Sequence, residues 1–215
     1  MATARRLLIL GTRTFSEEVA DLALDIPGVD VTAFVENLDK ERCAAPLAGL
    51  PVIWLPDAGP LAPTHECVCA LATTRRRRFT DAAAALGLRF TTLVHPSAHV
   101  SRSATIADGT IVNALAALAA QTTVGAHVIV NRGALIGHHT RVGRHVTIGP
   151  GVTIGGCSSI GDETFIGIGA TIGDRVSLGC RVVVGAGTLV MRDVPDGTEV
   201  ISSPGRTLRR PTDGR

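Results

Sequence analysis

The chain has 215 residues, of which 45% are apolar, and its formal net charge is +2. A chain of this length can bury one large core or two small ones, and this composition excludes a disordered protein and a strongly basic nucleic-acid-binding protein. Apolar stretches such as Arg5 to Gly11 are far shorter than the about 20 residues that cross a bilayer, and Met1 to Arg6 lacks the apolar segment of a signal peptide. We therefore expect a cytoplasmic protein with neither nucleic-acid nor membrane partners.

The first part of the chain alternates short apolar runs with helical patterns. Arg5 to Leu10 is an apolar run that ends at Gly11, and Thr14 to Ile26 has the periodicity of an amphipathic helix, with Ser16 as a candidate N-cap. The same rules predict a second helix at Thr74 to Leu86 and further strands at Val31 to Val35, Val52 to Leu55, Cys67 to Ala72 and Phe90 to Val94. This order predicts a small Rossmann-like α/β domain with a parallel sheet over residues 1–92.

Parallel sheets of this kind bind ligands beyond the carboxyl ends of their strands. Those ends fall near Gly11 to Ser16, Glu36 to Asp39 and Thr73 to Arg75. The first of these loops offers Arg13 and Thr14 to a phosphate. The run Arg75 to Arg78 could also grip a phosphate, but arginines at the start of a surface helix are usually solvated, and we favour that interpretation.

A six-residue repeat governs the rest of the chain. Every sixth residue from Val94 to Val190 is Val, Ile or Leu, and the fourth residue after it is small or β-branched. Glycine often follows the large residue, as at Gly137 and Gly155, where a tight corner favours a residue without Cβ. Three such hexapeptides make one triangular turn, and stacked turns bury a column of aliphatic side chains. The pattern predicts a parallel β-helix over residues 93–195, followed by a C-terminal extension at 196–215.

Residues eighteen apart should then lie above one another on adjacent turns, about 4.8 Å apart. One such column is Ala120, His138, Gly156 and Asp174, which places an imidazole beside a glycine whose backbone N–H is open to a ligand. A proton acceptor next to an oxyanion donor is what acyl transfer needs. A second column, His127, His145, Glu163 and Arg181, is expected to be surface stacking.

The whole layout resembles the sugar O- and N-acetyltransferases of the NeuD and PglD type. The resemblance spans nearly the whole chain and is most specific at Asn131 to His139, Pro150-Gly151, Gly155-Gly156, Val184 to Gly197 and Ser203 to Arg206. It implies a left-handed β-helix, a homotrimer, and acetyl-CoA as the acyl donor for an amino or hydroxyl group of a nucleotide-linked sugar, with no metal.

The resemblance also implies roles for individual residues. His138 matches the family's general base, Gly156 the residue whose N–H meets the acetyl carbonyl, and the Ile168 and Ala186 segments the backbone that lines the coenzyme A groove. Asn131 matches a nearby polar position and is a candidate substrate-binding residue.

The chain departs from the family at three places. His139 follows His138 where the family has an acidic residue, so His139 is a candidate catalytic partner, and Thr147 stands where the family has a second histidine. In the front domain the glycine-rich loop after the first strand is replaced by Gly11 to Ser16, where Gly11, Arg13 and Thr14 are the candidate substrate-binding residues.

Two other classes of function remain open. Histidines on neighbouring turns of a trimer could bind zinc, as in hydratases that resemble the γ-class carbonic anhydrases, although the adjacent His138 and His139 should point in different directions. The five cysteines are odd in number and lack a zinc-ligand spacing, so free, mostly buried thiols are expected. A non-catalytic scaffold trimer is the other alternative, because a repeat fold by itself carries no activity.

Overall fold

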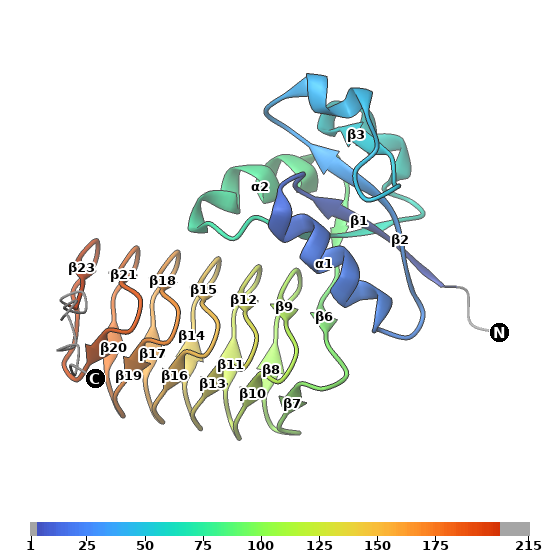
Figure 1. Ribbon diagram of the computed structural model, residues 1–215. Coiled ribbons are helices and arrows are strands. Elements are labelled where there is room, and N and C mark those ends of the chain that lie inside the picture. Colours follow the sequence, from blue (N-terminus) through green and yellow to red (C-terminus); the bar gives the residue numbers. More distant parts are fainter. Residues whose placement is uncertain (1–3, 203–215) are drawn as a thin grey trace, which may run out of the picture.

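The computed structural model describes residues 4–202, which form a small α/β unit resting on a long β-helix (Figure 1). The α/β unit has one parallel sheet with strand order β3-β2-β1-β4-β5. Its strands are β1 (Arg5–Leu10), β2 (Val29–Glu36), β3 (Val52–Trp54), β4 (Glu66–Cys69) and β5 (Arg89–Phe90). The predicted strand at Phe90 to Val94 is divided, because β5 joins this sheet while β6 (Leu93–Val94) starts the β-helix.

Helix α1 (Thr14–Leu24) covers one face of the sheet and packs its Val19 and Leu22 against Leu7 and Ile9. The prediction of Ser16 as the N-cap is wrong, since Arg13 occupies that position without a side-chain cap. Ser16 is fully buried, and its Oγ donates to the carbonyl oxygen of Ala70 at 3.4 Å. The hydroxyl therefore ties the helix to the sheet instead of starting it.

The other face of the sheet is covered by helix α2 (Arg77–Ala85) and by a 3₁₀ segment at Leu55–Leu61. Two further 3₁₀ segments lie at Lys40–Ala44 and Thr74–Arg76. Phe79 and Ala83 of α2 pack on Leu8 and Leu10. Successive apolar residues of β1 thus pack into two different hydrophobic cores, one on each face of the sheet, as expected for a strand that is buried on both sides.

The β-helix consists of two-residue strands stacked in three parallel sheets. The sheet nearest the α/β unit, here the junction sheet, holds β6, β9 (Ile111–Val112), β12 (Ile129–Val130), β15 (Thr147–Ile148), β18 (Phe165–Ile166), β21 (Val183–Val184) and β23 (Glu199–Val200). The second, here the apolar sheet, holds β7 (His99–Val100), β10 (Ala117–Leu118), β13 (Leu135–Ile136), β16 (Thr153–Ile154), β19 (Thr171–Ile172) and β22 (Leu189–Val190). The third, here the polar sheet, holds β8 (Thr105–Ile106), β11 (Thr123–Val124), β14 (Arg141–Val142), β17 (Ser159–Ile160) and β20 (Ser177–Leu178).

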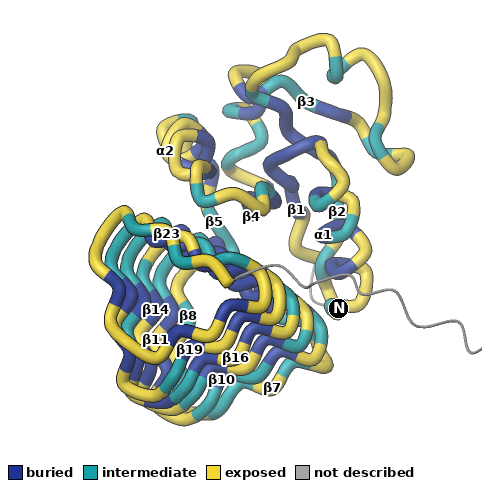
Figure 2. The backbone as a smooth tube through the Cα atoms, turned by 60° about the vertical axis from the view of Figure 1, so that its left-hand side comes forward, coloured by how far each residue is buried: buried dark blue, intermediate teal, exposed yellow. Residues whose placement is uncertain are grey.

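Strand pairing confirms the eighteen-residue register, because Leu135 pairs with Thr153 and Ala117 pairs with Leu135. The second residue of each strand points inward, so Ile136, Ile154 and Ile172 form part of one continuous core. Figure 2 shows this as a stack of rounded triangles with buried positions recurring along each side. The stacked parallel sheets are consistent with the left-handed β-helix that the family resemblance implies.

The last turn is shorter than the others. Val194 bridges Leu178 and β23 pairs with β21 at a spacing of sixteen residues, so two residues are missing from this turn. Strand β23 lies in the segment that the sequence assigned to the C-terminal extension. The motif at 203–206 lies outside the described residues.

A buried arginine joins the two parts of the molecule. Arg76 is 0% exposed, and its guanidinium donates to the carbonyl oxygens of Thr73 (2.7 Å), Val146 (2.7 Å) and His127 (2.9 Å) and to Oγ1 of Thr147 (2.8 Å). The prediction of a solvated arginine run is therefore wrong at Arg76. Only some side chains of a helical turn point toward the surface beneath it. Arg76 is one of these, and the surface beneath it is the β-helix.

His127 and His145 lie in the same junction and are not a surface ladder, as the sequence suggested. Their rings stack with centroids 4.8 Å apart, and Phe90 contacts His127 edge to face at 4.5 Å. The Nδ1 atoms of both rings are buried without a hydrogen-bond partner. Burial, His145 and the nearby Arg76 lower the pKa of His127 to about 4.

This depressed pKa predicts a loss of stability in mild acid. Below the ordinary histidine pKa of about 6.5 the unfolded chain binds a proton that the folded chain does not, so stability should fall as the pH drops from about 6.5 toward about 4. The slope from one proton is at most about 1.4 kcal/mol per pH unit. Urea midpoints at several pH values measure it, and His127→Gln should flatten the curve more than His99→Gln, an exposed site. Equal curves for both variants would contradict the assignment.

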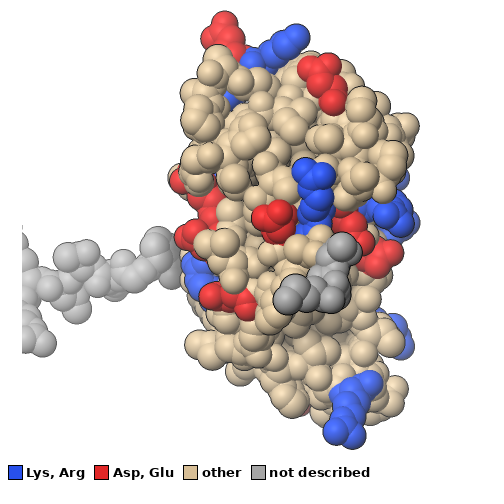
Figure 3. Space-filling model, turned by 90° about the vertical axis from the view of Figure 1, so that its right-hand side faces the viewer, with Lys and Arg blue, Asp and Glu red and all other residues tan. Residues whose placement is uncertain are grey.

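No helix within residues 4–202 is long and apolar enough to cross a membrane. On the face drawn in Figure 3, acidic and basic side chains are interspersed. Cys67 and Cys69 are buried free thiols, whereas Cys43 and Cys180 are partly exposed and Cys157 is exposed, so only two of the five are buried as expected.

Candidate active site

His138 lies at the corner between the apolar and polar sheets, here called the histidine corner (residues 137–140 and their equivalents on other turns). It follows the inward Ile136 and the corner Gly137, so its side chain is carried outward and is exposed. A Cβ on Gly137 would lie 2.5 Å from the backbone nitrogen of Gly156, so the turns can stack this closely only because the corner residue is glycine. The repeat therefore holds His138 at a fixed place on a rigid edge.

His139 turns back toward His138. Its φ is +58°, in the left-handed region, and this brings the two Nδ1 atoms to 3.1 Å with the ring planes at 87°. The expectation that adjacent histidines must point apart is wrong here because of that backbone conformation. One ring must donate and the other accept, so His139 can fix the tautomer of His138 as the family's acidic residue would.

A thiol completes the surroundings of the His138 ring. The Sγ of Cys157 lies 4.0 Å from Nδ1 of His138, and the backbone N–H of Cys157 donates to the carbonyl oxygen of His138 at 2.8 Å. Cys157 was not singled out in the sequence analysis, although its position eighteen residues after His139 would have placed it at this corner. Nδ1 of His138 is thus enclosed by polar groups, and the opposite nitrogen, Nε2, is the one directed at Gly156.

Gly156 is covered by the imidazole of His138. A Cβ built on Gly156 would lie 2.8 Å from Nε2 and 2.9 Å from Cε1 of that ring. Only glycine leaves room for the imidazole in this position. The column predicted from the eighteen-residue spacing is therefore real, and His138 and Gly156 are in direct contact.

The expectation that the Gly156 N–H is open is wrong. This N–H donates to Oδ1 of Asp174 at 2.7 Å, and Gly156 itself is buried between the two side chains. Asp162 caps the backbone N–H of Arg144 on the polar side in the same way, also at 2.7 Å. The sequence placed Asp174 in the correct column but did not show that its short side chain reaches back to the preceding turn.

The contact between Gly156 and His138 predicts a sharp effect of one methyl group. Gly156→Ala should displace the imidazole and lower turnover at least about tenfold, because misplacing a reacting group by 1 Å can cost about 10² in rate. Steady-state kinetics measure the loss, and circular dichroism shows whether the β-helix is retained. A variant that is folded and fully active would show that the position of His138 does not matter.

Ile168 and Ala186 lie on a different corner, between the junction and apolar sheets, here called the isoleucine corner (residues 131–134, 149–152, 167–170 and 185–188). Ile168 is 63% exposed and Ala186 is also exposed. Asn131 begins the same corner but is buried, and its amide donates to the carbonyl oxygen of Ile148 at 3.2 Å. Within one chain these three residues are therefore separated from His138 by the width of the apolar sheet.

The apolar sheet between the two corners is poorly suited to water. Leu135 is 47% and Leu189 is 63% exposed on its outer surface, and a shallow groove there runs past Ala117 and Leu135 to Gly137. The outward residues of the polar sheet are instead Thr105, Thr123, Arg141, Ser159 and Ser177. The two leucines lie three strands apart, with the outward Thr153 and Thr171 between them, so the exposed apolar surface consists of two separate parts.

Thr147, which stands where the family has a second histidine, is 2% exposed and accepts a hydrogen bond from Arg76. A larger imidazole would compete with the guanidinium for this space. Thr147, where this chain differs from the family, is therefore one of the residues that bind Arg76.

A second candidate site lies at the carboxyl ends of β1 and β2, as the sheet rule predicts. Thr12, Arg13, Thr14 and Arg42 line a cavity of about 380 Å³ whose far wall is apolar, with Leu47 and Val52. Gly11 is buried with φ +127°, and a Cβ on it would lie 2.7 Å from Oγ of Ser16. The structure thus brings the predicted Arg13 and Thr14 together and assigns Gly11 to close packing behind them.

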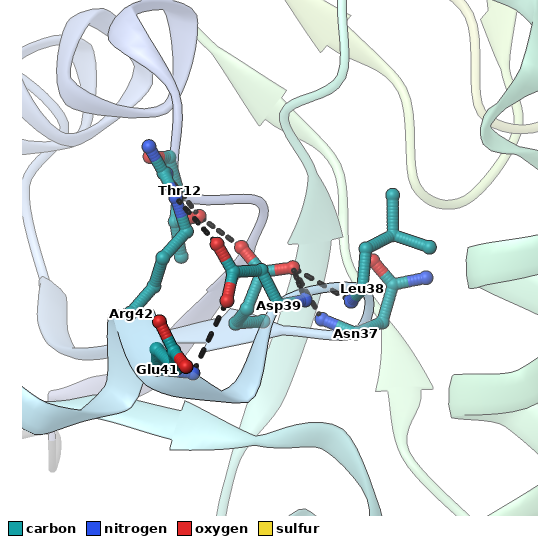
Figure 4. Close-up of polar contacts among 7 residues, drawn as sticks. Thr12, Asn37, Leu38, Asp39, Glu41 and Arg42 are labelled. Atoms are coloured by element: carbon teal, nitrogen blue, oxygen red, sulfur yellow. Dashed lines mark hydrogen bonds and ion pairs between the residues drawn. The ribbon is translucent and has the colours of Figure 1, made fainter.

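Glu36, which the sequence analysis named only as the start of a loop, anchors this site. Figure 4 shows Thr12 and Arg42 close to the loop residues Asn37, Leu38 and Asp39. Its Oε1 accepts from the backbone N–H groups of Asn37 (2.8 Å), Leu38 (2.7 Å) and Asp39 (3.3 Å), and its Oε2 accepts from the Thr12 hydroxyl. Burial alone would raise the pKa of Glu36, but these hydrogen bonds outweigh it and lower the pKa below the ordinary value. The carboxylate therefore serves to fix the loop.

Arg42 closes the loop from the other side. Its Nη1 donates to the carbonyl oxygen of Thr12 at 2.5 Å and to the Thr12 hydroxyl at 2.9 Å. Its Nε also lies 3.8 Å from Oδ2 of Asp39, and the side chain lines the cavity together with Arg13 and the acidic Glu17. Two arginines beside an apolar wall suit a ligand with an anionic group and a flat or apolar part.

Within residues 4–202 no three His, Cys, Asp or Glu side chains converge on a point where a metal could bind. The two columns of histidines lie at different corners, with His138 and His139 at one and His127 and His145 at another.

The hexapeptide β-helix with an exposed histidine on a glycine-lined corner defines an acyltransferase of the hexapeptide-repeat class. The model of the bacterial transferase hexapeptide family (six repeats) matches residues 121–156. The acetyltransferase domain of PglB from Neisseria gonorrhoeae, solved with acetyl coenzyme A, is 32% identical, with a TM-score of 0.85 over 95% of this chain and 100% of that one. A mutant of perosamine N-acetyltransferase from Caulobacter crescentus, solved with CoA and GDP-perosamine, is 27% identical, with a TM-score of 0.85 over 96% and 97% of the two chains.

WeeI from Acinetobacter baumannii shares the fold at 23% identity, with a TM-score of 0.85 over 95% of this chain and 100% of that one. No curated protein sequence matches the chain. On the identity and full-length coverage of the Neisseria domain, the chain belongs to the sugar O- and N-acetyltransferases of the NeuD and PglD type.

Proposed function

We propose that the protein transfers an acetyl group from acetyl-CoA to an amino or hydroxyl group of a nucleotide-linked sugar, with His138 as the general base. The observation that carries this proposal is the contact of the exposed His138 imidazole with Gly156 at a rigid corner of the β-helix. Two related chains with bound CoA or acetyl coenzyme A support the choice of donor. No metal enters the proposed reaction.

In the proposed reaction the acceptor and the thioester meet at the histidine corner. The acceptor attacks the acetyl carbonyl, and Nε2 of His138 takes the proton that the acceptor loses. Nδ1 of His138 carries a proton and donates it in a hydrogen bond to Nδ1 of His139, which leaves Nε2 free to act as the base. The Gly156 N–H stabilises the oxyanion of the tetrahedral intermediate. The intermediate then collapses with release of the coenzyme A thiolate, so the acetyl group passes directly to the acceptor.

We further propose that the working form is a homotrimer in which the apolar sheet contacts the next subunit. Both corners that carry predicted site residues border this sheet, and its leucines are exposed in the single chain. Contact between the histidine corner of one subunit and the isoleucine corner of the next would put His138 and Gly156 across a groove from Ile168 and Ala186. Asn131 would support that wall from below.

The α/β unit, residues 1–92, is proposed to be a Rossmann-like domain that holds the nucleotide part of the acceptor. Arg13 and Thr14 would bind its phosphate groups, with Gly11 permitting the tight loop and Arg42 beside them. Residues 93–195 would carry the transferase site. The GDP-perosamine complex of the related Caulobacter enzyme supports a nucleotide sugar as the acceptor class.

The test is calorimetric titration with acetyl-CoA and with coenzyme A, before and after chelator treatment, followed by an acceptor screen with and without nucleotide. Micromolar binding that chelator leaves unchanged, and acetyl transfer to a nucleotide-linked amino sugar, are expected. A protein that binds no coenzyme A and leaves acetyl-CoA intact with every acceptor would overturn the proposal. Stoichiometric zinc together with hydration of carbon dioxide would instead identify a hydratase. Absence of both activities would support the non-catalytic scaffold trimer.

A further inference from the structure

The backbone N–H of Gly156 has two competing acceptors if the proposed function holds. In the structure it donates to Oδ1 of Asp174 at 2.7 Å, and in the proposed reaction it must donate to the acetyl oxygen. One N–H can make one strong hydrogen bond at a time. We propose that Asp174 is a gate that closes the oxyanion donor in the free enzyme and must leave it when acetyl-CoA binds.

The surroundings allow Asp174 to move. Its side chain is exposed and forms no salt bridge within the described residues, so the bond to Gly156 is its one strong contact. Asp162 has the same backbone cap but is also held by the guanidinium of Arg144, with Nη2 to Oδ2 at 3.2 Å. Asp196 caps the N–H of Cys180 at 2.9 Å and, within the described residues, also forms no ion pair, so Asp174 is distinguished from Asp162 by its freedom and from Asp196 by its place at the histidine corner.

The negative charge of Asp174 would also oppose the reaction. A carboxylate that stayed at 2.7 Å from the donor would face the developing oxyanion with a like charge. Rotation of Asp174 into solvent removes both the competition and the repulsion. Because coenzyme A itself has no carbonyl at this point, the gate should oppose acetyl-CoA and leave coenzyme A unaffected.

This inference rests on the proposed function and is tested by binding. Asp174→Ala removes acceptor and charge, Asp174→Asn keeps an acceptor and removes the charge, and Asp162→Ala is the matched control on another corner. Asp174→Ala should tighten the binding of acetyl-CoA about 2- to 13-fold, the worth of one hydrogen bond, with the affinity for coenzyme A unchanged. Asp174→Asn should lie between wild type and Asp174→Ala, and Asp162→Ala should match wild type.

The outcomes separate the two proposals. Equal changes for acetyl-CoA and coenzyme A, weaker binding of acetyl-CoA, or no change in Asp174→Ala would overturn the gate while the proposed function stands. Failure of the wild type to bind either ligand would overturn the proposed function, and the gate with it. Circular dichroism of each variant checks that the β-helix is intact, and the Asp162→Ala control reports what the loss of a cap costs by itself.

Discussion

Replacing His138 with Ala should lower turnover by about 10² to 10⁴, the range for loss of a positioned general base. The imidazole is exposed, and its neighbours include His139, Cys157 and Gly156, so its removal should leave the fold intact. The affinity for coenzyme A should change little, since binding depends on the groove and not on the proton acceptor. Steady-state kinetics with a nucleotide-linked amino sugar, together with calorimetry, measure both quantities.

Two companion variants sharpen this result. Added imidazole should restore part of the activity of His138→Ala, because the cavity left beside Gly156 has the shape of the lost ring. His139→Ala should lower turnover less than His138→Ala and should shift its pH dependence, since His139 contacts only Nδ1. Full activity of His138→Ala would eliminate the proposed base.

Replacing Arg76 with Ala should lower the free energy of unfolding by about 3–5 kcal/mol, because several buried acceptors lose their donor and a cavity remains. The carbonyl oxygen of His127 and the Thr147 hydroxyl would be left unpaired, and the carbonyl oxygen of Val146 would keep only its bond from the N–H of Ile129. Arg76→Lys should cost less, since it keeps one donor but not the planar fork. Urea unfolding measures each loss.

The chain offers a matched control for this prediction two residues further on, in the first turn of α2. Arg78 is exposed, and Arg78→Ala should change the stability by no more than about 0.5 kcal/mol. If Arg76→Ala and Arg78→Ala were equally mild, the buried arginine would not be holding the α/β unit on the β-helix. A two-step unfolding curve for Arg76→Ala would show that the two parts have become uncoupled.

The architecture could be predicted from the sequence because both of its patterns, the six-residue repeat of the β-helix and the alternation of strands and helices in the α/β unit, follow from backbone geometry. A six-residue repeat of inward aliphatics admits one stacking arrangement, and the observed eighteen-residue register follows from three hexapeptides per turn. The alternation of strands and helices in the α/β unit likewise fixed a parallel sheet and placed Arg13 and Thr14 at its carboxyl edge. Period and register therefore identified the correct columns, including His138 above Gly156.

What the sequence missed depends on contacts between segments far apart in the chain. Arg76 was expected in solvent, yet it is buried because α2 docks on the β-helix, and His127 and His145 are covered by the same docking. The cap from Asp174 on Gly156 and the approach of His139 to His138 depend on side-chain reach and on a left-handed φ. Local periodicity determined which residues share a corner and the backbone hydrogen bonds between turns. Only the tertiary structure decided which polar groups at the corners are bonded, because those bonds are made by side chains that the repeat does not specify.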